Sequence, residues 1–211
     1  MEAITPQIVF YILGIPISST VISTWAAMVL IIASALLISK FSPAALDMIG
    51  ETLTGIISSV MSVQNTDTYL PLLGALAIFI AVSNSIGIVP ILTAPTSDIN
   101  TPIALSLAVF FGVHFYGVQQ KGLVNYFKGF ASPIFLLPFE IIGQVSRTLS
   151  LSLRLFGNII SGELISAIVF GLVPLIAPLP FVGLSLFLGI LQAYVFTALS
   201  SLYIDLAVSA K

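Results

Sequence analysis

Long apolar stretches alternate with short polar connections along this chain of 211 residues. Five such stretches cover residues 20–39, 69–92, 100–118, 133–172 and 180–210. Each approaches or exceeds the roughly 20 residues that a helix needs to cross a bilayer. The pattern predicts one membrane domain over 1–211 with five membrane helices, preceded by an N-terminal segment over 1–19.

A more polar stretch, 44–65, separates the first two apolar ones. Its apolar residues recur at spacings of three and four, which is typical of an amphipathic helix. Such a helix either anchors the chain at the membrane surface or packs on the bundle without a further role. The pattern leaves both interpretations open.

The fourth apolar stretch is too long for an upright helix. Its 40 residues would extend roughly 60 Å, about twice the hydrocarbon thickness. We therefore expect a helix that is kinked, steeply tilted or partly in the membrane plane, with Pro138 as the place for a kink near its start. Together with the last stretch it should form a long, tilted C-terminal hairpin.

Composition narrows the class of protein. The chain is 58% hydrophobic and 7% charged, whereas soluble domains carry about 25% charged residues. Long continuous apolar runs favour an all-α membrane protein over a barrel. Six basic residues without a basic patch argue against nucleic-acid binding. No metal-site spacing or phosphate-binding glycine loop is present in the sequence, so we expect no cofactor.

The N-terminal segment and the positions of the lysines indicate how the chain is oriented across a membrane. The first 19 residues do not resemble a signal peptide, since they lack a basic region and are interrupted by proline and glycine. With five membrane segments, Lys40, Lys121, Lys128 and Lys211 all fall on one side. The positive-inside rule assigns that side to the cytoplasm or its organellar equivalent.

Polar residues recur within the fourth stretch at intervals of three, four and seven. Seven residues make about two helical turns, so these side chains share one face. Small residues form the neighbouring strip, which would let another helix approach closely. The polar stripe comprises Glu140, Gln144, Arg147, Arg154, Asn158 and Ser161, and the small strip comprises Ser146, Ser150, Gly157 and Ser161.

Arg154 carries the largest energetic penalty in this stripe. An arginine at the centre of a membrane helix costs at least ~2.5–3.5 kcal/mol, and it does not lose its charge. Glu140 and Glu163 are the nearest acidic residues in the sequence, too few for Arg147 and Arg154 together. This imbalance favours a carboxylate supplied by another subunit over an interior helix whose polar groups only bond to their neighbours.

Glu163 follows Arg154 by nine residues, which turns a helix by about 900° and points the two side chains in roughly opposite directions. A carboxylate alone at membrane depth is a candidate for proton or ion relay, and a structural, hydrogen-bonded glutamate is the alternative. In the last stretch, Ser185 and Gln192 share a face. A hairpin of the last two stretches would bring Gln192 to the level of Arg154.

The runs SLSLRLFGN (150–158) and GEL (162–164) resemble the signature of subunit a of F-type rotary ATP synthases. PTSDIN (95–100) resembles the loop before that family's middle spans, and LQAYVF (191–196) resembles its last helix. The resemblance extends from about residue 69 to the C-terminus, and the run around Arg154 is highly specific.

The resemblance implies a membrane stator against which a ring of c subunits turns, with peripheral-stalk b subunits as further partners. Two offset half-channels would carry a proton or sodium ion to and from the ring. Arg154 matches the family's essential arginine. Among the other matching positions, Asn158, Glu163 and Gln192 line a channel or support the arginine, whereas Glu140 and Arg147 lie towards the cytoplasmic exit.

One position departs from the family pattern. Many bacterial members have a histidine on the last helix where this chain has Ser185. The outer half-channel would then depend on Glu163 with hydroxyl groups, water and Asp98. The resemblance also implies no nucleotide site in this chain and a bacterial plasma membrane location, with an organellar inner or thylakoid membrane as the alternative. The competing functions are a stand-alone secondary transporter or channel and a structural scaffold.

Overall fold

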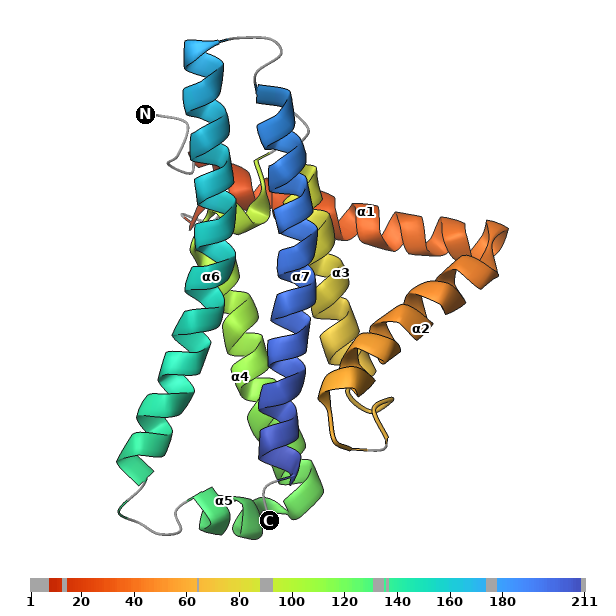
Figure 1. Cartoon of the computed structure of the whole chain (residues 1–211), viewed down its shortest axis with the longest axis vertical. Helices are drawn as coiled ribbons and strands as arrows, with labels where there is room; N and C mark the ends of the chain where they lie inside the picture. The colour runs from red at the N-terminus through yellow and green to blue at the C-terminus, as the bar shows by residue number, and fades with distance from the viewer. Residues whose placement is uncertain are drawn as a thin grey trace.

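The computed structural model of the chain describes residues 8–12, 15–63, 65–87, 93–130, 135, 137–173 and 178–209 (Figure 1). Within these residues, a short antiparallel β-hairpin precedes the helices. The elements are β1 (Ile8–Ile12), β2 (Ile15–Ser18), α1 (Ser19–Phe41), α2 (Pro43–Val60), α3 (Leu70–Ile86), the 3-10 turn η1 (Pro95–Ser97), α4 (Asn100–Lys121), α5 (Leu123–Phe130), α6 (Leu137–Leu172) and α7 (Pro178–Ser209).

The predicted all-α membrane class is confirmed. Among the described helices, α1, α4, α6 and α7 are long and apolar enough to cross a membrane. The second predicted span, 69–92, is shorter than expected, because α3 has 17 residues and ends at Ile86 before Gly87. Residues 88–92, which we assigned to the same span, lie outside the described part, as do Lys211 and most of 131–136.

Local sequence explains where several helices begin and end. Pro43 is in the first turn of α2, where its missing N–H has no intrahelical partner to lose. Gly122 separates α4 from α5 with φ of 78°, a conformation that suits glycine, and its N–H bonds to Val118 O at 2.8 Å. The predicted kink at Pro138 is wrong, since this proline is the second residue of α6 and is tolerated there.

The helices α6 and α7 form the predicted long hairpin (Figure 1). With 36 and 32 residues, they extend roughly 54 and 48 Å. The helix α1 runs across their direction in Figure 1. If α1 crosses the bilayer upright, the hairpin must therefore be strongly tilted. How each end is oriented across a membrane stays a prediction.

The core lies where α3, α4 and α6 pack against α7. Two glycines allow backbones to approach closely: a Cβ on Gly189 would lie 2.8 Å from Asn84 Cβ, and one on Gly162 would lie 2.6 Å from Ser185 Oγ. The helix α2 contacts α1, α3 and α7, and Ile57 is its one buried residue. Both interpretations of this amphipathic helix remain compatible with that packing.

Candidate functional site

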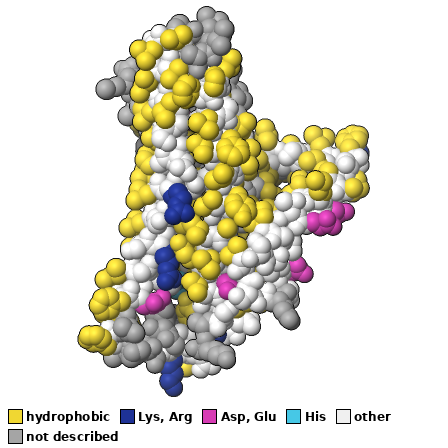
Figure 2. Space-filling view, viewed as in Figure 1, with side chains coloured by type: hydrophobic (Ala, Val, Ile, Leu, Met, Phe, Trp, Pro, Cys, Tyr) yellow, Lys and Arg dark blue, Asp and Glu magenta, His cyan; other side chains and the backbone are white. Residues whose placement is uncertain are grey.

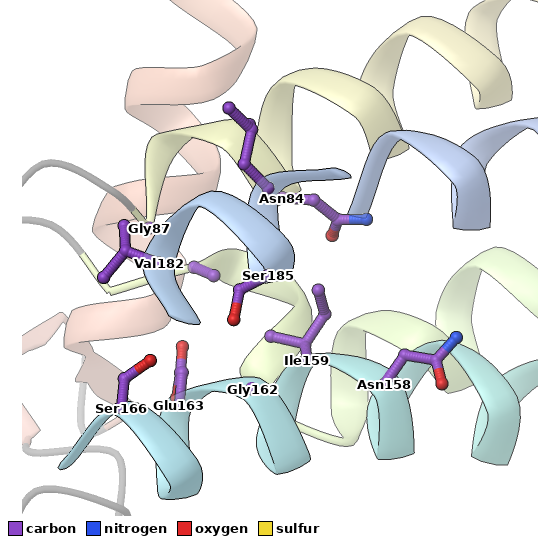
Figure 3. Close-up of a pocket in the computed structure, with 11 residues that line it drawn as sticks. Asn84, Gly87, Asn158, Ile159, Gly162, Glu163, Ser166, Val182 and Ser185 are labelled. Carbon is purple, nitrogen blue, oxygen red and sulfur yellow. The ribbon is translucent and has the colours of Figure 1, made fainter. Parts of the chain in front are cut away.

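A polar cavity of about 210 Å³ lies between α3, α6 and α7 (Figure 3). It is large enough for several water molecules. Gly87, Ala94 and several apolar side chains complete its walls. Its polar lining residues are Asn84, Asn158, Glu163, Ser166 and Ser185. The cavity therefore contains a carboxylate and neutral hydrogen-bonding groups between apolar helices.

Glu163 and Ser185 face the same space from α6 and α7 (Figure 3). Gly162 permits this approach because a larger residue would meet the Ser185 hydroxyl. Ser97 of η1, which packs against α6, lies near the Glu163 carboxylate. Arg154 does not line this cavity. The structure thus agrees with the predicted separation of Glu163 from Arg154.

Asn158 and Gln192 link the two long helices next to this cavity. Asn158 Nδ2 donates to Gln192 Oε1 at 2.7 Å. Asn158 lies about one helical turn after Arg154, so the prediction that Gln192 lies at the level of Arg154 is confirmed to within about one turn. Gln192 is 1% exposed, and its Nε2 has no acceptor among the described residues. A buried donor without an acceptor costs about 1–3 kcal/mol, which a water molecule or an incoming group would recover.

Figure 2 shows Lys and Arg side chains on the face that carries α6 and α7, with apolar side chains around them. Arg147 is half-buried, and its guanidinium carbon lies 5.7 Å from the centre of the Tyr203 ring. Arg154 is exposed. Within the described residues, no carboxylate lies at ion-pair distance from either arginine.

The polar stripe of α6 follows the edge of the packed face. Gln144, Arg147 and Asn158 are half-buried, while Arg154 and Ser161 are exposed. The buried positions are Leu151, Ser152, Leu155 and Ile159, and the apolar residues opposite the stripe, such as Val145 and Leu149, are exposed. The apolar side of α6 therefore faces lipid or a partner, and the small residues Ser150 and Gly157 are exposed beside Arg154.

Glu140 lies at the other end of α6 from Glu163. Gln144 Nε2 is 3.5 Å from Glu140 Oε1. Burial, and to a lesser degree the Glu140 charge, raise the pKa of Tyr126 in α5. A second acidic position thus lies near α5, on the far side of Arg154 along the helix.

Asp98 does not line the cavity. Its Oδ2 accepts from Thr20 Oγ1 at 3.0 Å, and its Oδ1 accepts from the Asn100 N–H at 3.1 Å and from Asn100 Nδ2 at 2.9 Å. In this structure Asp98 joins the start of α1 to the start of α4. A role in ion transfer stays a prediction for this residue.

Three polar residues near the cavity were missed from sequence: Asn84, Thr96 and Ser166. The polar triplet 83–85 near the end of an otherwise apolar helix was the available signal for Asn84. Asp205, 6% exposed, accepts from the Ser62 N–H at 3.0 Å and joins the end of α2 to α7. Among the described residues, no group of His, Cys, Asp and Glu could hold a metal ion.

A helical membrane protein with a carboxylate-lined cavity and an uncompensated arginine on one long helix falls in the class of ion-translocating membrane proteins. Comparison with known proteins identifies the family within this class. The family described as ATP synthase A chain matches residues 14–205, and the chain belongs to it. It is therefore a multi-pass, non-catalytic membrane subunit of an ATP synthase.

Its relatives match along almost their entire length. The chain is 39% identical to ATP synthase subunit a 2 of Bradyrhizobium sp., covering 98% of this chain and 96% of the relative. It is 38% identical to ATP synthase subunit a 2 of Picosynechococcus sp., over 99% and 94%. It is 37% identical to ATP synthase subunit a of Nitrosospira multiformis, over 96% and 85%.

Proposed function

We propose that this chain is the ion-translocating stator of its ATP synthase and that Arg154 faces the carboxylates of a rotating ring of c subunits. The observation that carries this proposal is the exposure of Arg154 on a membrane-spanning helix, without an acidic partner among the described residues. A permanent charge at membrane depth requires compensation. A carboxylate brought by a neighbouring subunit supplies it.

The surface around Arg154 suits a second helix. Ser150, Gly157 and Ser161 are exposed on the same helix, and a Cβ on Gly157 would meet nothing within 4 Å. Small residues let helix backbones approach closely in membranes. Leu153, 55% exposed, adds apolar surface beside this strip. These features support a helical partner at this face.

The chemistry follows from the fixed charge. Arg154 attracts each arriving ring carboxylate and favours its ionised form, which releases the bound ion. The guanidinium keeps its proton, whereas a lysine could lose it. Its field also opposes a cation that would leak straight through. The membrane potential supplies about 2.3 kcal/mol per elementary charge per 100 mV for this step.

Two separate access paths meet at Arg154 in this proposal. The cavity at Glu163, Ser185 and Asn158 serves as the outer path, and the Glu140 end of α6 serves as the inner one. Gln192 holds Asn158 beside the arginine. The transported ion is a proton or a sodium ion, and peripheral-stalk b subunits keep the chain from turning with the ring in a bacterial plasma membrane.

The variant Arg154→Ala tests the proposal. We expect it to abolish ATP-driven ion pumping and ATP synthesis in membrane vesicles, because the ring carboxylate loses its cationic partner. The assembled complex should remain, as shown by the amount of this chain that purifies with it. Leu153→Ala, next to it and also exposed, is the control and should keep most of the activity. Normal pumping by Arg154→Ala would refute the proposal.

A further inference from the structure

The short turn η1 is buried in the bundle although it belongs to a connection between helices. Pro95 and Thr96 are less than 2% exposed. The turn contacts α1, α3, α4 and α6. Ala94, directly before it, lines the cavity that contains Glu163. The turn thus lies directly next to this cavity.

A chain of buried hydrogen bonds runs from this turn to α7. Thr96 Oγ1 donates to Asn84 Oδ1 at 2.6 Å. Asn84 Nδ2 in turn donates to the Gly189 carbonyl oxygen at 2.9 Å. The Thr96 hydroxyl occupies the amide oxygen and so leaves the amide nitrogen directed to α7. Both ends of the Asn84 side chain, which lines the cavity, are fixed in this way.

The next residue of the turn is close to another residue of the cavity lining. Ser97 lies near Glu163 on α6. Its own backbone N–H and hydroxyl both bond to the Ala94 carbonyl oxygen, at 3.0 and 2.8 Å. Of two consecutive residues of this turn, Thr96 therefore contacts Asn84 and Ser97 lies near Glu163, and both Asn84 and Glu163 line the cavity.

We infer that Thr96 is a positioning residue for ion access to Glu163. Its hydroxyl fixes the Asn84 amide and holds η1 against the cavity, which sets the width and polarity of the path. Thr96 itself, 0% exposed, does not touch the ion. The inference rests on the proposed function of the cavity as the outer access path.

The matched variants are Thr96→Val, which keeps the shape of the side chain and removes the hydroxyl, and Thr96→Ser, which keeps the hydroxyl. In the complete ATP synthase complex, we expect Thr96→Val to lower passive ion conduction about five- to tenfold, as the loss of one buried hydrogen bond implies. Thr96→Ser should stay within about twofold of the parent. The ion concentration that gives half-maximal conduction should change when the ion is varied on the outer side of the membrane. It should stay constant when the ion is varied on the inner side.

A second measurement does not depend on activity. The chain has no cysteine, so Ser166→Cys introduces one thiol into the cavity lining. In assembled complexes, Thr96→Val should change the rate at which a membrane-impermeant thiol reagent labels this cysteine from the outer side, and Thr96→Ser should not. Equal labelling rates in the parent, Thr96→Val and Thr96→Ser backgrounds would overturn the inference. Equal effects of Thr96→Val and Thr96→Ser would overturn it as well. If labelling responds but Arg154→Ala pumps normally, the proposed role of Arg154 fails, while the effect of Thr96 on access to the cavity stands.

Discussion

At the residue scale, the hydrogen bond between Asn158 and Gln192 marks the boundary between two environments on α6. Beyond it, Glu163 lines a cavity with Ser185. One turn before it, Arg154 lies on the exposed side of the helix. Because the carboxylate and the guanidinium do not share a pocket, neither neutralises the other. Each stays available for a charge that arrives from outside the chain.

This separation gives a prediction for Glu163. Glu163→Gln removes a group that can bind and release a proton or cation, and Glu163→Asp retains it. We expect the Gln variant to slow ATP synthesis by about 10²-fold or more, the range for loss of a proton-transfer group, and the Asp variant to be milder. The measurement is the ATP synthesis rate in vesicles at a fixed driving force.

Glu51→Gln is a suitable control for the Glu163 variants, because Glu51 is an exposed glutamate of α2 that does not line the cavity. It should leave the rate close to that of the parent. Full activity of Glu163→Gln would give Glu163 a structural role, which is the alternative that the sequence left open.

At the element scale, the position of the cavity depends on how closely α3 approaches α7. Asn84 and Gly189 meet at this contact, where a Cβ on Gly189 would lie 2.8 Å from Asn84 Cβ. A Cβ is not the far end of a flexible side chain, so a backbone would have to move. The same contact holds the Asn84 amide against the Gly189 carbonyl oxygen. The packing of α3 against α7 and the orientation of the Asn84 amide therefore depend on the same contact.

Gly189→Ala tests this coupling, with Gly183→Ala on the same helix as its control, because a Cβ on Gly183 would meet nothing within 4 Å. Alanine favours a helix over glycine by about 1 kcal/mol, and overpacking a tight contact costs about 1–3 kcal/mol. We expect Gly183→Ala to be neutral or stabilising and Gly189→Ala to be less stable than it by about 1–3 kcal/mol. Unfolding of the purified chain in detergent measures the difference, and equal stabilities would contradict the contact.

Periodicity predicted the helices and the polar stripe because both repeat along the sequence. The approach of Gln192 to Asn158 also followed, since a hairpin of two long helices has few possible registers. The early end of α3, the helix α5 and the β-hairpin β1–β2 did not follow, because short elements leave little repeating pattern. The contact of Thr96 with Asn84 depends on a connection folding back into the bundle, which spacing along the chain does not encode.

At the scale of the whole molecule, the hairpin α6–α7 is a long surface set across the direction of α1 (Figure 1). Its outer side presents apolar residues, as in Leu149, Leu153 and Phe187, at 51%, 55% and 61% exposure. The cavity and Arg154 occupy different parts of this hairpin. In the proposed function, the path for an ion is therefore incomplete within the described residues and needs a partner that moves charge between the two places.

An incomplete path predicts that the chain is inactive alone. Purified and reconstituted into liposomes without other subunits, it should give no proton or sodium flux above that of liposomes with Arg154→Ala, because no ring carboxylate carries the ion past the arginine. The same preparation assembled with the remaining subunits should conduct, and the Arg154→Ala complex should not. A fluorescent proton indicator and sodium tracer uptake measure both fluxes. A flux through the isolated chain that disappears in Arg154→Ala would instead identify a self-contained transporter, since the whole pathway would then lie within these helices.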